Sequence, residues 1–202
     1  MPDKKVTPRI AILGWGSLIW DDNWPKFDQQ RDDWLEDGPV LPLEFSRVSG
    51  KTRGGALTLV IDEANGRDAQ VMYAMSKRRN PDDAIADLRD REGTILKRIG
   101  VYDLTDTARK GEPPVPATIP DWAKLKKIDV VVWTGLPSNF PEKNVVREGE
   151  PFSVDAAIAH LQGLKPEGKA AATTYVWRAP AFVKTPLRER LETEPWFKQD
   201  AP

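Results

Sequence analysis

The sequence predicts an α+β protein. Short apolar segments separated by glycine turns fill the first third of the chain and are typical of strands. A strong helix start follows at residue 80, and a further strand and a further helix are indicated in the second half. A chain of 202 residues can bury well over half of its unfolded surface. Since no clear linker interrupts the chain, we expect a single domain over residues 1–202.

The first predicted strand covers residues 9–13, where the sequence reads RIAIL, and Gly14 and Gly16 break the apolar run behind it. Residues 20–38 are polar, aromatic and acidic, which is typical of a surface segment, with a short helix over 29–35 as one alternative. Three further strands, separated by turns that contain glycine, are predicted at residues 41–48, 56–61 and 69–75. Successive strands of this kind predict a β-meander.

Residues 80–83, Asn-Pro-Asp-Asp, predict the start of a helix. Asparagine can cap the helix, proline suits its first position, and the two acids complement the positive end of its dipole. The expected apolar stripe of this helix comprises Ile85, Leu88, Leu96 and Ile99. Residues 126–133 predict a buried strand, and Ser153 caps a second helix. Because most prolines lie after residue 112, we expect the second half to consist mainly of loops and short elements.

The composition excludes several kinds of chemistry. The chain has no cysteine, which rules out a thiol nucleophile, a disulfide, a cysteine-ligated zinc ion and an iron–sulfur cluster. Its one histidine, His160, cannot form a multi-histidine metal site and is expected at the surface. We therefore expect no metal and no cofactor, and carboxylates are the remaining candidates for acid and base catalysis.

The charges indicate a small-molecule or protein partner. Lysine and arginine number 30 against 31 acidic residues, and no basic stripe suggests binding to nucleic acid or to an anionic membrane. The longest apolar run, residues 10–20, is shorter than the roughly 20 residues that a membrane-spanning helix needs. No small-residue cleavage site follows that run, so a cytoplasmic protein is expected.

Glu92 is the first candidate for catalysis. Helical spacing from residue 81 places its carboxylate on the apolar stripe, whereas the other acids of the segment fall outside it. A carboxylate in apolar surroundings has a raised pKa and can serve as a base or acid near neutral pH. The alternative is that Gly93 ends the helix and leaves Glu92 solvated or paired with Arg89 or Arg91.

The second candidate is the loop Gly14-Trp15-Gly16-Ser17-Leu18. Its two glycines allow backbone N–H groups to approach a carboxylate, a phosphate or a developing oxyanion closely. The third glycine of a dinucleotide fingerprint is replaced by Ile19, and no P-loop lysine follows. A tight turn with buried tryptophans is the alternative. A nearby group of cations could bind an anion or form a solvated hairpin face: Arg47, Lys51 and Arg53.

These residues resemble a known family. ILGWGSLIW, residues 12–20, resembles the YGSL signature of the gamma-glutamylcyclotransferase-like family, particularly the GYGSLIW form of its glutathione-degrading ChaC-like branch. Residues 45–48 and 53–54 resemble the arginine-rich stretch of the family, and AIADLRDRE, residues 84–92, is similar to its helix that ends in Arg-Glu. The resemblance covers residues 9–165 and leaves 166–202 as a C-terminal extension.

The resemblance implies a small mixed β-barrel with flanking helices and an enzyme that releases 5-oxoproline from a gamma-glutamyl amide. The alpha-amine of the substrate attacks its own gamma-carbonyl group, so the reaction requires no thiol, metal or cofactor. Glu92 is then the general acid/base. The backbone of Gly14, Trp15, Gly16, Ser17 and Leu18 holds the alpha-carboxylate and the oxyanion, and Arg53 is a second anchor. Two alternatives remain, a binding module without turnover and an amide hydrolase that uses water.

The partner implied is a small gamma-glutamyl compound whose amine is not specified. Trp15 stands where the family usually has tyrosine, and no tyrosine occurs in residues 141–149 to supply the late aromatic of some members. Tyr175 is a candidate for that aromatic by elimination. The oligomeric state is not predicted by these features.

Overall fold

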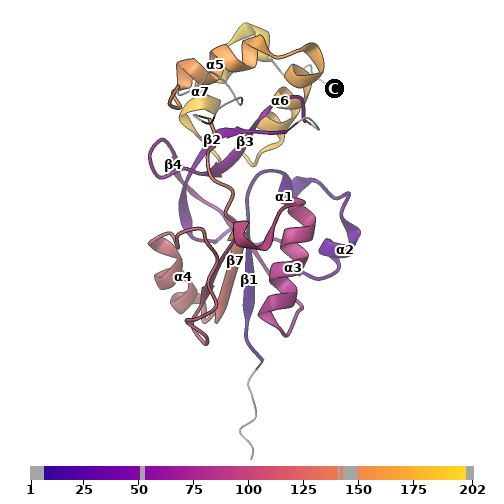
Figure 1. The fold of residues 1–202 in the computed structure, drawn as a ribbon, viewed down its shortest axis with the longest axis vertical. Helices are drawn as coiled ribbons and strands as arrows, with labels where there is room; N and C mark the ends of the chain where they lie inside the picture. Colours follow the sequence, from indigo (N-terminus) through magenta and orange to yellow (C-terminus); the bar gives the residue numbers. More distant parts are fainter. Residues whose placement is uncertain (1–6, 51–52, 141, 143–149, 199–202) are drawn as a thin grey trace, which may run out of the picture. The chain divides into compact units, whose positions relative to one another are not determined.

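The computed structural model describes residues 7–50, 53–140, 142 and 150–198 (Figure 1). The chain divides into two compact units, and each is built from three separated segments. Unit 1 consists of Met1–Gly14, Asp21–Val40 and Gln70–Leu136. Unit 2 consists of Trp15–Trp20, Leu41–Ala69 and Pro137–Pro202. Strands and helices occur in both units, so the predicted α+β class is confirmed, while a single domain over residues 1–202 stays a prediction.

Unit 1 contains a four-stranded sheet in the order β5-β1-β7-β6. Its strands are β1 (Ile10–Gly14), β5 (Met72–Met75), β6 (Ile99–Asp103) and β7 (Val130–Thr134). β1 is parallel to β7 and antiparallel to β5, and β6 is antiparallel to β7. The two central strands are buried along almost their whole length, as expected for the continuous apolar runs IAILG and VVVWT.

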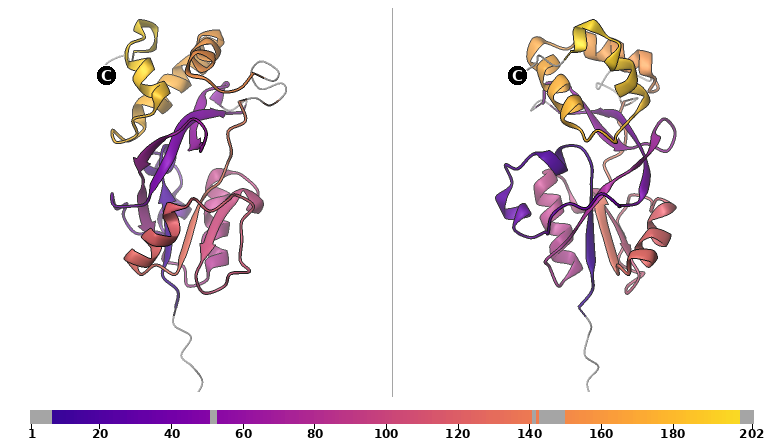
Figure 2. Two further views of the ribbon diagram at one scale, coloured as in Figure 1. Left: turned by 90° about the vertical axis from the view of Figure 1, so that its left-hand side faces the viewer. Right: turned by 180° about the vertical axis from the view of Figure 1, so that it is seen from behind.

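Helix α3 (Pro81–Glu92) packs against β1, β6 and β7 of this sheet (Figures 1 and 2). The predicted start is confirmed, because the Asn80 side chain accepts a hydrogen bond from the Asp82 N–H group. The helix ends at Gly93, which has the left-handed φ of 57°. The predicted continuation of the apolar stripe is therefore wrong. Leu96 lies in a short 3-10 helix and is 53% exposed, and Ile99 begins β6.

The remaining elements of unit 1 correct two further boundaries. They are α2 (Pro25–Asp28), η2 (Leu96–Arg98) and α4 (Thr118–Lys126). No helix forms over residues 29–35, because Arg31 and Leu35 make antiparallel bridges to Ser76 and Tyr73. The strand predicted at 126–133 begins at Val130, since the first residue of that segment still belongs to α4.

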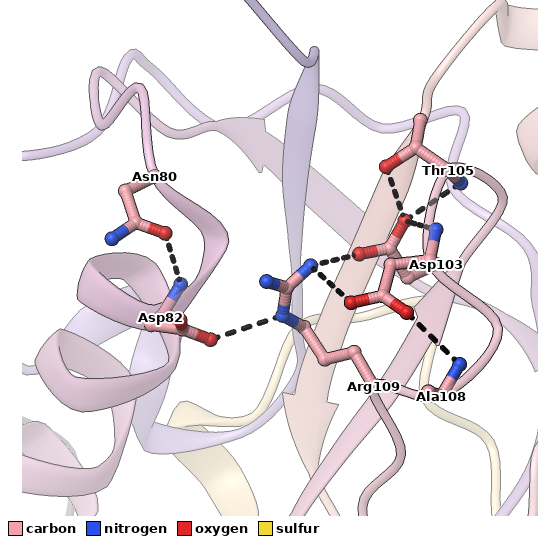
Figure 3. A network of polar contacts seen from close by, with 7 residues as sticks. Asn80, Asp82, Asp103, Thr105, Ala108 and Arg109 are labelled. Atoms are coloured by element: carbon pink, nitrogen blue, oxygen red, sulfur yellow. Dashed lines mark hydrogen bonds and ion pairs between the residues drawn. The ribbon is translucent and has the colours of Figure 1, made fainter.

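A polar network fixes the start of α3 to the end of β6 (Figure 3). Arg109 donates one hydrogen bond to Asp82 on α3, at 3.0 Å, and another to Asp103 at the end of β6. The Asp103 side chain is fully buried and also accepts hydrogen bonds from the Thr105 N–H and hydroxyl groups. Burial alone would raise the pKa of Asp103. The hydrogen bonds have the opposite and, taken together, larger effect, so this pKa lies below its ordinary value.

Unit 2 contains a three-stranded sheet in the order β3-β2-β4. Its strands are β2 (Val40–Val48), β3 (Leu57–Ile61) and β4 (Arg67–Gln70). The predicted β-meander is wrong, since β2 lies in the middle and pairs with both others. The strand predicted at 69–75 is interrupted at Val71, and its two halves belong to different sheets. Strands of the described residues thus form two sheets, and the expected small mixed barrel is not confirmed.

The helices of unit 2 include the whole C-terminal segment. They are α1 (Ser17–Trp20), α5 (Val154–Gly163), α6 (Pro166–Arg178), α7 (Pro186–Glu192) and η3 (Pro195–Phe197). The predicted Ser153 cap is confirmed, because its hydroxyl accepts a hydrogen bond from the Ala156 N–H at 3.1 Å. Figure 2 shows the orange and yellow helices gathered on one side of β2 and β3. The expectation of mainly loops and short elements is confirmed only in part, since several of the prolines begin helices, of which α6 has 13 residues.

The surroundings of His160 and the lengths of the helices bear on two further expectations. His160, expected at the surface, is partly buried in unit 2, and its Nε2 atom lies 2.7 Å from the Gly55 carbonyl oxygen. Of the helices in the described part of the chain, none is long and apolar enough to cross a membrane.

Candidate functional site

Glu92 and Gly14 lie toward the same end of the strands in the unit 1 sheet. Arg109 holds the start of α3 at the end of β6. β6 is antiparallel to β7, and β7 is parallel to β1, so β6 ends where β1 begins. α3 has 12 residues, is about 18 Å long and packs on β1. It therefore runs in the same direction as β1. Its last residue, Glu92, lies toward the C-terminal end of β1, where Gly14 is the last residue of the strand.

Glu92 is shielded without being buried. Its side chain is 18% exposed, and its Oε1 atom lies 3.8 Å from Nη1 of Arg91. The Arg91 side chain is only 4% exposed, lies 3.6 Å from the Asp21 carboxylate and stacks over the Trp24 ring at 4.9 Å. Gly93 ends the helix and Glu92 is paired with Arg91, as the alternative to a catalytic role proposed, and the carboxylate stands beside a buried guanidinium instead of in open solvent. The raised pKa expected for Glu92 stays a prediction.

Gly14 is required by packing. A Cβ atom at this position would lie 2.5 Å from the ring of Trp34, closer than side chains tolerate. The glycine lets the indole cover the end of β1 in unit 1.

The loop that follows belongs to unit 2 and turns at Gly16. The φ of Gly16 is 57°, and a Cβ atom there would lie 2.7 Å from the Tyr175 hydroxyl group. Trp15 is buried and donates its indole N–H to the Leu59 carbonyl oxygen at 3.2 Å. Leu18 is buried as well. Side chains of the loop thus belong to the core of unit 2, and its backbone follows a conformation that glycine permits.

Arg53 lies next to this loop. Its Nη2 atom is 3.5 Å from the Ser17 hydroxyl oxygen, and its guanidinium lies 5.0 Å from the centre of the Tyr175 ring. Arg47 instead donates to the Pro137 carbonyl oxygen at 2.7 Å, and Lys51 lies outside the described residues. Unit 2 therefore brings a cation, two hydroxyl groups and a glycine turn together, a combination suited to a carboxylate.

Tyr175 is the residue that sequence reasoning found only by elimination. It lies on α6, in the segment described as a C-terminal extension. Its ring makes edge-on contacts with Trp20 and Phe45, at centroid distances of 5.9 and 6.2 Å. No local motif marks it, because its role follows from the packing of α6 on α1 and β3.

The predicted site residues are divided between the units. Unit 1 holds Gly14 and Glu92, and unit 2 holds Trp15, Gly16, Ser17, Leu18 and Arg53. Within the described ranges, no group of three or more histidine or acidic side chains could hold a metal ion.

Searches against protein-family models, curated proteins and solved structures find no match to this chain.

Proposed function

We propose that the chain is an enzyme of the gamma-glutamylcyclotransferase type, which releases 5-oxoproline from a gamma-glutamyl amide, with Glu92 as general acid/base. The main support for this proposal is the position and partial exposure of Glu92. Glu92 is the last residue of a helix that packs along β1, and it lies toward the end of β1 at which Gly14 begins the glycine loop. Its side chain is 18% exposed. A base needs this balance, because it must reach substrate and yet be kept from bulk water.

In the proposed reaction, Glu92 takes a proton from the alpha-ammonium group of the substrate. The amine nitrogen then forms a bond to the gamma-carbonyl carbon, and the bond from that carbon to the leaving nitrogen breaks. Glu92 returns its proton to the leaving nitrogen. The second proton lost by the ammonium group goes to the released amine or to water. Most of the rate enhancement would come from folding the substrate into attack geometry, as in other intramolecular reactions.

The loop and Arg53 supply the complementary roles in this proposal. The backbone N–H groups of residues 14–18 would bind the alpha-carboxylate and the carbonyl oxygen as it becomes negative. Arg53 supports the same role, since its guanidinium lies close to the Ser17 hydroxyl group and stacks on Tyr175. A nucleophile carried by the substrate also suits a chain that has no cysteine and a single histidine.

The test is 5-oxoproline release from a panel of gamma-glutamyl amines and peptides by the intact chain and by Glu92→Gln. General acid/base catalysis contributes about a hundredfold or more, so the glutamine variant should lose at least this much in kcat. Asp83→Asn is the matched control, because Asp83 is an exposed carboxylate on the same helix. Unchanged 5-oxoproline release by Glu92→Gln would exclude Glu92 as the base.

The two alternatives give different products. A water-using hydrolase would release free glutamate in place of 5-oxoproline. A binding module would release neither from any compound of the panel, and yet a gamma-glutamyl ligand would raise its melting temperature.

A further inference from the structure

Unit 1 contains a cavity of about 430 Å³ beside α2 and the last turns of α3. This volume falls within the range of about 300–1,000 Å³ that is usual for small-molecule sites. Trp24 and Phe27 supply aromatic surface to its wall, and Lys26, Gln30 and Arg91 supply polar groups. The cavity is therefore suited to a ligand that has both a ring and polar atoms.

Trp24 is the most informative residue of the wall. It is 40% exposed although it is among the largest apolar side chains of the unit. One face of its ring is occupied by Arg91, whose guanidinium lies 4.9 Å from the ring centre. Because the indole lines the cavity, a ligand ring placed there would remove apolar surface from water.

The charges around the cavity favour an anionic group in the ligand. Both acids of the wall are already bound by arginine: Asp87 accepts hydrogen bonds from Arg78 at 2.7 and 2.8 Å, and Asp90 is paired with Arg89. Lys26 is exposed on the same wall and forms no ion pair with any acid in the described part of the chain. Its ammonium group is thus available to an anionic ligand.

The cavity is also close to the proposed base. Arg91 lines the cavity, and its Nη1 atom lies 3.8 Å from the Glu92 carboxylate. Glu92 must reach the nitrogen of the leaving amine to return its proton. A leaving amine within reach of Glu92 would therefore lie near the cavity, because Arg91 contacts both.

We infer that this cavity binds the amine portion of the substrate, and that this portion is an aromatic amino acid whose ring stacks on Trp24 and whose carboxylate pairs with Lys26. The substrate class is accordingly gamma-glutamyl dipeptides such as gamma-glutamyl-phenylalanine. This inference rests on the proposed function and assigns Trp24 and Lys26 to specificity, not to the chemical step.

Three substrates separate the two contacts: gamma-glutamyl-phenylalanine, gamma-glutamyl-alanine, which lacks the ring, and gamma-glutamyl-2-phenylethylamine, which lacks the carboxylate. Trp24→Ala should reduce kcat/KM for the two aromatic substrates about three- to tenfold and leave gamma-glutamyl-alanine unchanged. Lys26→Met should reduce kcat/KM about two- to fivefold only where the leaving group has a carboxylate. Lys124→Met, an exposed lysine on α4, is the control and should change none of the three rates.

Calorimetric binding of free phenylalanine provides a second measurement that does not depend on turnover. Binding to the intact chain that Trp24→Ala and Lys26→Met both weaken supports the cavity assignment. Equal kcat/KM for all three substrates, together with no difference between the variants in phenylalanine binding, overturns the assignment and leaves the proposed function intact. Absence of 5-oxoproline from every substrate overturns the proposed function, and phenylalanine binding then still decides about the cavity.

Discussion

Glu44 should make the stability of the protein fall as the pH rises. This residue of β2 in unit 2 is fully buried, and its carboxylate accepts hydrogen bonds from the N–H groups of Phe45 at 2.7 Å and Leu187 at 3.2 Å. Burial raises the pKa of Glu44 to about 7, against the lowering effect of hydrogen bonds from Thr185, Phe45 and Leu187. The ordinary value is 4.5.

The direction in which the free energy of unfolding changes with pH depends on which state, folded or unfolded, binds the proton of Glu44 more tightly. Between the ordinary pKa of 4.5 and the folded pKa of about 7, the folded chain binds the proton of Glu44 more tightly than the unfolded chain. The stabilisation from this proton is complete below the ordinary pKa and is lost as the pH rises through 7. At about 1.4 kcal/mol per pKa unit, the loss amounts to about 3 kcal/mol.

Glu44→Gln removes this dependence, because an amide does not titrate. The variant gives up one of two acceptor oxygens, and this loss contributes about 1 kcal/mol that does not depend on pH. Urea unfolding followed by circular dichroism gives the free energy of unfolding of both proteins between about pH 4.5 and 8. The difference, intact chain minus variant, should fall by about 3 kcal/mol across this interval.

Glu63→Gln serves as the control, since Glu63 is an exposed carboxylate in the same unit. A difference for Glu44→Gln that stays level, or rises with pH, would mean that Glu44 is ionised in the folded chain at acidic pH. The backbone N–H donors would then outweigh burial, and the raised pKa of Glu44 would be refuted.

Three further perturbations test the fold. Arg109→Met leaves the buried Asp103 carboxylate without its guanidinium and should cost about 2 kcal/mol by urea unfolding at neutral pH. Because the pKa of Asp103 is lowered in the folded chain, its stabilisation is lost as the pH falls, so the deficit of the variant should shrink in acid. Gly16→Ala should cost about 1–2 kcal/mol from its positive φ alone, and Tyr175→Phe in the same chain should recover only the additional loss from the clash. Ser153→Ala should lower the melting temperature by removing about 1 kcal/mol of capping, which Ser153→Asp restores.

Local signals in the sequence predicted the elements whose causes are local. The cap and proline at 80–81, the cap at Ser153 and the apolar run of β1 each act within one turn or one strand, and each was confirmed. The strand order was predicted wrongly because pairing is set by long-range packing. β4 pairs with β2 instead of β3, although β3 is nearer in the sequence.

Prolines misled the interpretation of the second half. A proline breaks a helix in its interior but suits the first position, where no backbone N–H donor is needed. Pro166, Pro186 and Pro195 all occupy such first positions, so a high proline content was compatible with successive helices. Tyr175 and Glu44 depend on those helices for their neighbours, and neither could be assigned an environment before α6 and α7 were known.

Helical spacing alone could not decide whether Arg91 or Glu92 lies on the buried face of α3. From Leu88 the apolar stripe can continue in a step of three, to Arg91, or in a step of four, to Glu92. The buried residues of α3 follow the step of three, and the Arg91 side chain is 4% exposed while that of Glu92 is 18% exposed. The carboxylate therefore stands at the border of the buried face, with a guanidinium beneath it. This position leaves the Glu92 carboxylate partly accessible, as the proton transfer proposed for it needs.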